Sequence, residues 1–314
     1  MITQRSIRVS LEHAGERLDA FVAGAIPTTS KPRVARAVER RWVMVNGQWA
    51  KKGHRLHQGD VVSVERLLED TDWKAEPNLA IRIPLLHEEP TFLVIDKPAG
   101  MPVHPLDAEE TDTVVNGLLA AYPELAGIGP DPLFPAVVHR LDAETSGVMV
   151  AARDAKTYEG LRRQFKERKV TKKYVAMVGG RVADGGRAEH LLAHSLGEEH
   201  RMIVMTDTEP KAGRRPMRAI TEYAVRERLA RHTLLDVVIR TGVTHQIRCQ
   251  LAHLGHAIAG DTLYGSREAD AGYRGRLFLH ASEISFRDPT TGEPRVFRAP
   301  LPADLQTAQA ALPR

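Results

Sequence analysis

The chain has 314 residues, of which 42% are hydrophobic and 27% charged, so it contains enough apolar material to bury a sizeable core. Lys and Arg outnumber Asp and Glu by 44 to 40 and the pI is about 9.2, an excess that permits a polyanionic partner without requiring one. A single cysteine excludes an internal disulfide, and the sequence shows neither the apolar core of a signal peptide nor a run of ~18 apolar residues. We therefore expect a cytoplasmic protein without a membrane partner.

The stretch over residues 67–80 is polar and acidic and contains Pro77, which predicts a boundary between two domains. We place a small domain at residues 1–70, a linker at 71–80 and a larger domain at 81–314. A small domain followed by a larger one is therefore the expected organisation.

The small domain is expected to hold two helices followed by short strands. The first helix is predicted by an apolar face made of Leu18, Phe21, Val22 and Ile26. Ser30 is expected to cap a second helix from Lys31 to Arg41, with Pro32 at its first position. Asn46-Gly47 predicts a hairpin turn, and residues 61–65 predict a closing strand.

The second predicted helix is strongly basic, and its charges fit either a solvated face or a surface for a polyanion. The basic residues are Lys31, Arg33, Arg36, Arg40 and Arg41. The segment resembles the ribosomal-protein-S-four-like (alpha-L) RNA-binding domain, on its RLD opening, basic helix, V-x-V-N-G hairpin and closing G-D-x-V strand. That resemblance implies RNA binding. Lys31 stands where the family usually has arginine, which keeps the charge but loses a bidentate phosphate contact.

The larger domain alternates predicted strands with a few helices. Strands are expected over residues 81–90, 91–98, 137–141, 147–152, 173–180, 219–225, 233–241, 278–286 and 294–299. Helices are expected over residues 113–122, 156–169 and 244–256, the last closed by Gly255. Because the connections read as hairpins as often as crossovers, we expect an α+β fold on a mixed, largely antiparallel sheet, preceded by a small α/β domain.

Nucleotide-cofactor chemistry is not expected, because the chain has neither a phosphate-cradling Gly-Lys-Ser/Thr loop nor a dinucleotide fingerprint after a strand. His245, His253 and His256 share a predicted helix, which raises the alternative of a metal-dependent nuclease. No cysteine or carboxylate stands at the spacing of a zinc motif, so we expect no metal.

The segment HRLDAETSGVMVAA places Asp142 between two apolar runs, directly after His139, Arg140 and Leu141. A carboxylate beside an arginine at a strand end is either a structural ion pair or a catalytic group, and the residues alone leave both open.

This segment resembles the signature H-R-L-D-x-x-T-S-G of the RluA family of pseudouridine synthases. Further blocks of that family match at residues 94–105, 165–180, 241–265 and 279–302. The resemblance implies the pseudouridine synthase fold and the isomerisation of uridine in structured RNA, with no cofactor and no metal. It assigns covalent catalysis to Asp142, the neighbouring cation to Arg248, and stacking on the uracil with proton transfer to Tyr174.

The same resemblance suggests RNA contacts in the larger domain, at His139, Arg140, Lys97, His245 and Gln246. Arg140 is expected to stabilise the flipped-out base or to hold its own turn, and Lys97 is read mainly as structural or RNA-facing. Val243 stands where the family usually has arginine, which removes one expected contact.

The implied partner is large-subunit ribosomal RNA, with transfer RNA as the alternative substrate. A non-catalytic RNA-binding ribosome-assembly protein is the alternative class of function. We expect a monomer, because no large apolar interface is marked.

Overall fold

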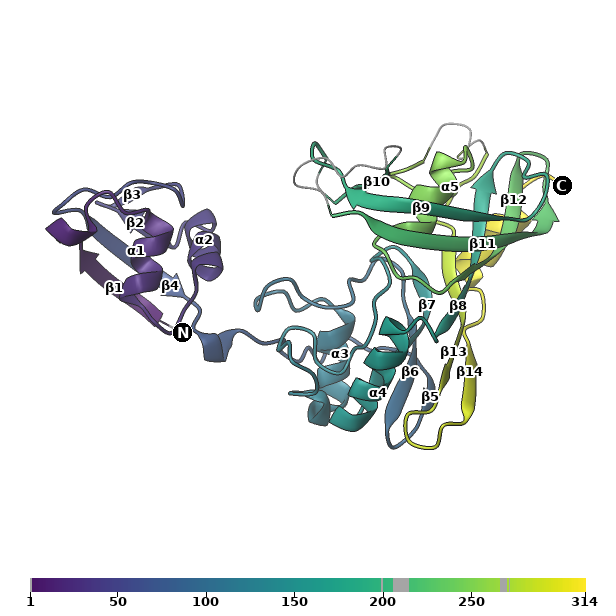
Figure 1. Ribbon diagram of the computed structural model, residues 1–314, viewed down its shortest axis with the longest axis horizontal. Helices are drawn as coiled ribbons and strands as arrows, with labels where there is room; N and C mark the ends of the chain where they lie inside the picture. Colours follow the sequence, from purple (N-terminus) through teal and green to yellow (C-terminus); the bar gives the residue numbers. More distant parts are fainter. Residues whose placement is uncertain (1, 199, 206–214, 266–269, 271) are drawn as a thin grey trace. The chain divides into compact units, whose positions relative to one another are not determined.

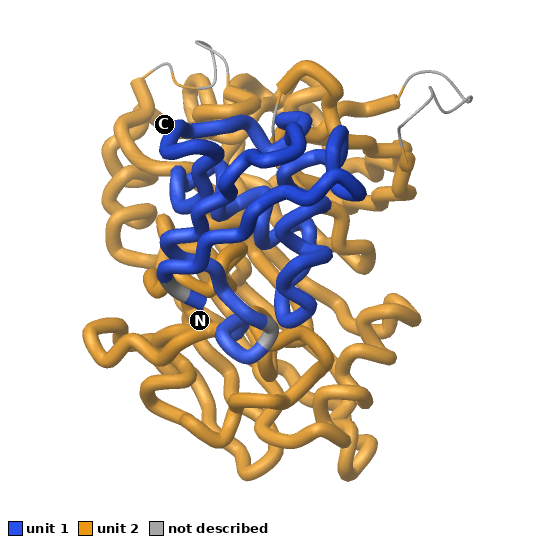
Figure 2. Tube along the Cα trace, turned by 90° about the vertical axis from the view of Figure 1, so that its left-hand side faces the viewer, with its two compact units in different colours: residues 1–74 blue, residues 75–314 orange. Residues whose placement is uncertain are grey.

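The computed structural model describes residues 2–198, 200–205, 215–265, 270 and 272–314. The chain divides into two compact units, residues 1–74 and 75–314, coloured separately in Figure 2. Each unit has its own apolar core, so each is described by itself. Among the described residues, no helix has both the length and the apolar composition needed to cross a membrane.

The smaller unit is a four-stranded antiparallel sheet with two helices (Figure 1). The strands, in the order β1-β4-β2-β3, are β1 (Ile2–Arg8), β4 (Val61–Leu67), β2 (Val43–Val45) and β3 (Gln48–Trp49). The helices are α1 (Leu18–Ala25) and α2 (Lys31–Glu39), with short 3-10 turns η1 (Leu11–His13) and η2 (Asp70–Asp72). The core joins the helices to the sheet through Leu18, Phe21, Val34, Val62 and Val64.

Both predicted helices and the predicted hairpin of this unit are confirmed. Asn46 and Gly47 have φ of 51° and 74°, the left-handed pair that a two-residue hairpin turn needs. Ser30 is the N-cap residue of α2, as predicted, but its side chain makes no capping hydrogen bond. The helix ends at Glu39 rather than Arg41, where φ is 62° and the helical path cannot continue.

The larger unit is built on one ten-stranded sheet, ordered β10-β9-β11-β12-β8-β13-β7-β6-β5, with β14 paired to β13. The strands in chain order are β5 (Leu85–Glu88), β6 (Phe92–Lys97), β7 (Ser146–Ala152), β8 (Thr171–Gly179), β9 (Gly186–His194), β10 (Met202–Val204), β11 (Met217–Arg228), β12 (His232–Ile239), β13 (Leu279–Arg287) and β14 (Pro294–Arg298). Among the described strands only β7 and β13 pair in parallel, so the mixed, largely antiparallel sheet that was predicted is confirmed.

The parallel pairing of β7 with β13 is short and brings two backbones very close together. It joins His280 to Ser146 and Ala281 to Gly147. Gly147 has a φ of 119°, and a Cβ atom there would lie 2.2 Å from the carbonyl oxygen of Ala281. Only glycine satisfies both conditions. The glycine therefore fixes where β7 begins, four residues after Asp142.

Helices α3 (Val114–Ala121) and α4 (Ala155–Lys166) lie beside the β5–β7 part of the sheet (Figure 1). A capping box of Thr113 with Asn116 starts α3, and the Asp154 side chain accepts from Thr157 N at 2.8 Å to start α4. Helix α5 (Gln246–His253) packs against β9, β10 and β11. The remaining helical segments are η3 (Pro123–Leu125) and α6 (Ala303–Ala310).

One predicted strand of the larger unit was wrong, and several elements were not predicted. Residues 137–141 form a single bridge, from Val137 to Ala151, instead of a strand. Pro135 has no N–H to donate and Ala136 has a φ of 64°, so the chain cannot run extended into that segment. Strands β1, β9 and β10 and helix α6 lay outside the predicted set.

Candidate active site

A cavity of about 80 Å³ lies where the turn before β7, the end of β12 and the start of α5 meet. Asp142, Tyr174 and Arg248, the three residues predicted to be catalytic, all line it. They are separated by 32 to 106 positions in the sequence, so the sheet and α5 bring them together.

Asp142 is held in a tight turn and keeps part of its carboxylate accessible. Thr145 N donates to the carbonyl oxygen of Asp142 at 3.1 Å, which closes the turn. The Asp142 side chain is 18% exposed, and Arg248 Nη1 lies 3.5 Å from its Oδ2 atom. The carboxylate is therefore paired with a cation and still open to the cavity.

Arg248 is fixed by a second carboxylate that sequence reasoning did not single out. Its Nε donates to Asp261 Oδ2 at 2.8 Å and its Nη2 to Oδ1 at 2.9 Å, a bidentate pair. The Asp261 side chain has 0% exposure and also accepts from the backbone N–H groups of Leu263 and Tyr264. The block at 241–265 contains this aspartate in the sequence A-G-D-T-L-Y-G, the only signal that could have found it.

The pKa values follow from this pairing. Burial opposes ionisation of Asp261, but the hydrogen bonds and charge of Arg248 outweigh it and hold the Asp261 pKa below its ordinary value. Burial likewise acts to lower the pKa of Arg248, and Asp261 together with Asp142 raises it overall. Arg248 therefore stays cationic while it faces Asp142.

Tyr174 lies on β8, opposite Val237 of β12 and Ala281 of β13. Its side chain is buried and forms part of the cavity wall. Burial raises the pKa of the phenol, and the charge of Asp142 adds to the rise. The phenol is therefore protonated near neutral pH, so it offers a ring face and a hydroxyl hydrogen to whatever enters.

His245, predicted as an RNA contact, is a wall of the same cavity. Its Nε2 lies 4.0 Å from Asp142 Oδ1 and its Nδ1 lies 3.1 Å from the hydroxyl oxygen of Tyr264. Burial lowers the pKa of His245, although the charge of Asp142 opposes the shift. A neutral imidazole therefore stands between Tyr264 and Asp142.

Lys97 is enclosed under the Asp142 turn, so the prediction that it contacts RNA was wrong. The side chain is 0% exposed. Its Nζ donates to the carbonyl oxygens of Pro98, Met101 and Ala143 at 2.7, 2.6 and 2.8 Å. Burial lowers the pKa of Lys97 to about 7, against the charges of Glu144 and Asp142. The structural reading of Lys97 is the one that the geometry supports.

His139 and Gln246 were also predicted to contact RNA, and both are committed to internal contacts instead. His139 Nε2 accepts from Val150 N at 3.1 Å, its Nδ1 is shielded from solvent, and its ring stacks on Phe165 with centroids 4.7 Å apart. Gln246 is 3% exposed and makes hydrogen bonds with Thr241, Val243, Ile220 and Thr221. Neither side chain presents a free polar group to a ligand.

Arg140 behaves differently, because it is exposed and lines both the cavity and a neighbouring surface groove of about 1220 Å³. Val243, where an arginine was expected, also lies between the cavity and the groove. Lys172 completes this wall, and its Nζ donates to the carbonyl oxygen of Thr241 at 2.8 Å.

The three histidines predicted to share a helix do not form a metal site, and of the three only His253 lies within α5. His245 faces Asp142, His253 packs against His190 with centroids 5.0 Å apart, and His256 Nδ1 lies 3.3 Å from the carbonyl oxygen of Gly179. Within the described ranges, no group of three or more His, Cys, Asp or Glu side chains has the geometry to hold a metal ion.

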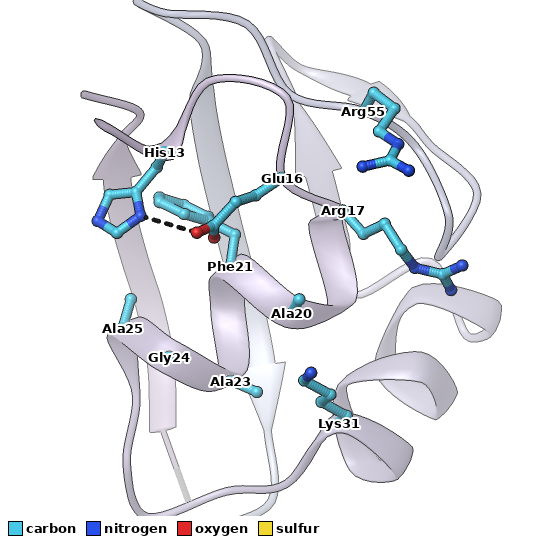
Figure 3. A pocket seen from close by; sticks show the side chains of 10 residues that line it. All are labelled: His13, Glu16, Arg17, Ala20, Phe21, Ala23, Gly24, Ala25, Lys31 and Arg55. Atoms are coloured by element: carbon cyan, nitrogen blue, oxygen red, sulfur yellow. Dashed lines mark ion pairs between the residues drawn. The ribbon is translucent and has the colours of Figure 1, made fainter. Parts of the chain in front are cut away.

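The residues of the smaller unit that were predicted to bind RNA lie on α2 or directly after it. Lys31 is exposed and lines a concave surface of about 710 Å³, together with Arg17 and Arg55 (Figure 3). The guanidinium groups of Arg33 and Arg36 lie 4.9 and 5.2 Å from the ring centroid of Trp73, and that of Arg40 lies 5.0 Å from Trp42.

Comparison with known proteins identifies the family to which this chain belongs. The family model for RNA pseudouridylate synthase matches residues 91–253. Ribosomal large subunit pseudouridine synthase D of Xanthomonas campestris is 37% identical over 95% of this chain and 89% of its own length. The uncharacterized RNA pseudouridine synthase YlyB of Bacillus subtilis is 35% identical over 97% of this chain and 96% of its own length.

Solved structures agree with these relatives. Human RNA pseudouridylate synthase domain containing 1 is 25% identical, with a TM-score of 0.59 over 76% of this chain and 91% of that one. Human RNA pseudouridylate synthase domain containing 4 shares the fold with a TM-score of 0.56. The chain therefore belongs to the RNA pseudouridine synthases of the RluA type, and it is an isomerase that acts on uridines in RNA.

Proposed function

We propose that this enzyme converts specific uridines of large-subunit ribosomal RNA to pseudouridine in the cytoplasm, with Asp142 as its catalytic carboxylate. Several of the relatives, among them the one from Neisseria meningitidis serogroup B at 34% identity, are named ribosomal large subunit pseudouridine synthase D. The observation that carries the assignment of Asp142 is its position in a small cavity, paired with a buried arginine and still 18% exposed.

The reaction needs one carboxylate held in its ionised form. The bond between uracil N1 and ribose C1′ breaks, a bond between C5 and C1′ forms, and the hydrogen of C5 is lost while N1 gains one. Atoms and electrons balance within the nucleoside, so neither an oxidant nor a nucleotide cofactor has a step to perform. Asp142 supplies the negative charge, whether it attacks C1′, adds to the base or assists a glycal route.

Arg248 is the cation that faces this carboxylate in the cavity. A negative charge in a site from which RNA excludes water is stabilised by a fixed positive charge beside it. Because Asp261 holds two nitrogens of Arg248, the third is presented to Asp142 in one orientation. The pair is therefore prepared before the substrate arrives, which is the condition for electrostatic stabilisation.

Tyr174 and Arg140 act on the base. The ring of Tyr174 forms a wall of the cavity, so it can stack on uracil, and its hydroxyl can take part in the transfer of hydrogen from C5. A base inside a stem must leave the stack before it reaches Asp142. Arg140 is exposed at the rim, where it can hold the flipped nucleotide.

The smaller unit is proposed to add affinity for RNA. Lys31, Arg17 and Arg55 line one concave surface, where Arg17 is also paired with Asp19. The guanidinium groups of Arg33, Arg36 and Arg40, on and just after α2, lie over tryptophan rings. Positive charge on a rigid surface of this kind supports non-specific contact with phosphate. We also infer that the enzyme acts as a monomer.

The substrate is tested by incubating the purified full chain with unmodified transcripts of large-subunit ribosomal RNA and, separately, with a pool of unmodified transfer RNA transcripts. Pseudouridines are then mapped in both. New pseudouridine at one or a few positions of the ribosomal transcript is expected. Conversion confined to transfer RNA would overturn the substrate, and binding of both RNAs without conversion would favour the ribosome-assembly alternative.

A further inference from the structure

We propose that the groove beside the catalytic cavity binds the phosphate backbone of the RNA strand that carries the target uridine. This inference rests on the proposed function, since it names how the substrate strand approaches Asp142. The groove, called here the α4 groove, is lined on its charged side by Arg140, Arg163, Lys166, Arg168 and Arg240.

The α4 groove and the catalytic cavity are adjacent. The groove has a volume of about 1220 Å³, and four residues line both spaces: Arg140, Lys172, Gly242 and Val243. A strand lying in the groove is therefore next to the Asp142 cavity. This adjacency distinguishes the groove from a basic patch elsewhere on the molecule.

The five exposed cations named above come from three separate segments. Arg163, Lys166 and Arg168 come from the last turn of α4 and the residues just after it, Arg140 precedes the Asp142 turn, and Arg240 follows β12. Cations at the C-terminal end of a helix interact favourably with the helix dipole, which could explain Arg163, Lys166 and Arg168 without any ligand. The dipole does not explain Arg140 and Arg240, which belong to other segments and line the same groove.

These five cations are exposed, and in the part of the chain that the structure describes none of them makes an ion pair with a carboxylate. The acidic residue in the lining, Glu167, pairs with Lys169 at 2.7 Å, and its charge also acts on Arg163 and Lys166. Arg218, which also lines the groove, is paired with Glu189. The five cations therefore outnumber the one carboxylate near them, and a polyanion in the groove would relieve their mutual repulsion.

The floor of the α4 groove is less polar than its wall. Phe165 is half-buried against His139, Met217 is 39% exposed, and Val243 stands at the passage to the cavity. Grooves that combine cations with aromatic or apolar surface are suited to unpaired strands, because the backbone meets charge while bases or riboses meet the floor. An unpaired strand is also the form in which a flipped uridine can be presented.

The test removes three of the cations together, as Arg163→Gln/Lys166→Gln/Arg168→Gln. The matched control removes three exposed cations of the same unit that line neither space, as Arg82→Gln/Lys156→Gln/Arg231→Gln. Both are made in full-length Asp142→Asn protein, so that chemistry does not alter the probe. The probe is a fluorescein-labelled twelve-residue oligouridylate, and its anisotropy gives Kd at several KCl concentrations.

Three lost phosphate contacts should lower the slope of log Kd against log[KCl] by about 2, because each contact on a single strand contributes about 0.7. At ~0.15 M salt the same extrapolation predicts binding weaker by roughly 10- to 100-fold. The control should match the parent protein in both quantities. Equal slopes for the groove variant and the control would overturn the proposal, whatever the absolute affinities.

Failure of the proposal is separable from failure of the proposed function. Conversion of ribosomal transcript by the wild-type chain tests the function and does not involve the oligouridylate. If the wild type converts RNA and the groove variant keeps the parent slope, the α4 groove is excluded and the function stands. If the slope falls by about 2 but no RNA is converted, the groove stands and the function fails.

Discussion

Arg248 and Asp261 form a buried bidentate pair that leaves the third nitrogen of the guanidinium, Nη1, 3.5 Å from Asp142 Oδ2. One arginine thus bridges two carboxylates with different surroundings. Asp261 is fully enclosed and hydrogen-bonded on both oxygens, whereas Asp142 is open to the cavity. Asp261 is therefore a positioning residue, which acts on Asp142 through Arg248.

Asp261→Asn should lower both stability and turnover. The amide keeps the shape but leaves the Arg248 cation buried without its main partner, which costs about 3–5 kcal/mol of unfolding free energy. Urea unfolding followed by circular dichroism measures this, since all three tryptophans lie in the smaller unit. For conversion, kcat should fall while KM is nearly unchanged, because the residue does not touch RNA.

Asp304→Asn is the matched control for that variant. Asp304 also accepts from an arginine, Arg276, at 2.7 Å, but its side chain is 55% exposed. An exposed pair contributes about 0–1 kcal/mol. Equal loss of unfolding free energy in Asp261→Asn and Asp304→Asn would show that burial does not make the Arg248 pair more important for stability than an exposed pair.

Lys97→Met tests whether the enclosed ammonium holds the Asp142 turn. Methionine fills similar space but leaves the carbonyl groups of Pro98, Met101 and Ala143 without a donor. Each buried carbonyl left unpaired costs about 1–3 kcal/mol. We expect lower stability and slower conversion at saturating RNA, measured in single turnover. Lys156→Met, an exposed lysine on α4, is the control and should match the wild type.

The acid stability of the enzyme should depend on His139. Burial, with the nearby charge of Lys172, lowers the pKa of His139 to about 3 in the fold, while an unfolded histidine titrates near ~6.5. Between these two pKa values the unfolded state binds a proton that the folded state does not. The contribution of His139 to the unfolding free energy is therefore fully present above pH ~6.5 and is lost as pH falls below it. This one group should account for about 2 kcal/mol of lost unfolding free energy between pH ~7.5 and ~5.

His139→Gln removes that titration and should flatten the acid side of the stability curve by the same amount. Urea unfolding at a series of pH values measures the difference from wild type. His194→Gln changes an exposed histidine of the same unit and should run parallel to the wild type. A His139→Gln curve that is also parallel would refute the assigned burial of the ring.

Local pattern was enough to predict much of the fold. The helical spacing of apolar residues predicted the helices Val114–Ala121 and Ala155–Lys166, and Asn46-Gly47 predicted the hairpin. Strand β1 could not be found in this way, because most of its residues are exposed and its extended form depends on pairing with β4, almost sixty residues later. Residues 137–141 were wrongly predicted as a strand because Val137, Val138 and Leu141 are apolar and buried, although the backbone bends just before them, at Ala136.

The site residues were likewise predicted only in part. The sequence predicted Asp142, Tyr174 and Arg248 as one group, and the structure brings them to one cavity, although their catalytic roles stay predictions. Lys97, His139 and Gln246 were placed on the RNA side because they are polar and lie in matching blocks. Sequence cannot show that their polar atoms are turned inward onto backbone groups. Asp261 was overlooked because no spacing pattern links it to Arg248. The two side chains meet only once the chain has turned back after α5.

The most direct test of the central claim uses RNA labelled with tritium at uracil C5 and compares wild type with Asp142→Asn. Formation of the C5–C1′ bond releases the label to water, so the release counts turnovers. The account predicts release by the wild type and by the exposed control Asp184→Asn, and none above background by Asp142→Asn, which should still bind the oligouridylate. Release by Asp142→Asn at the wild-type rate would contradict it.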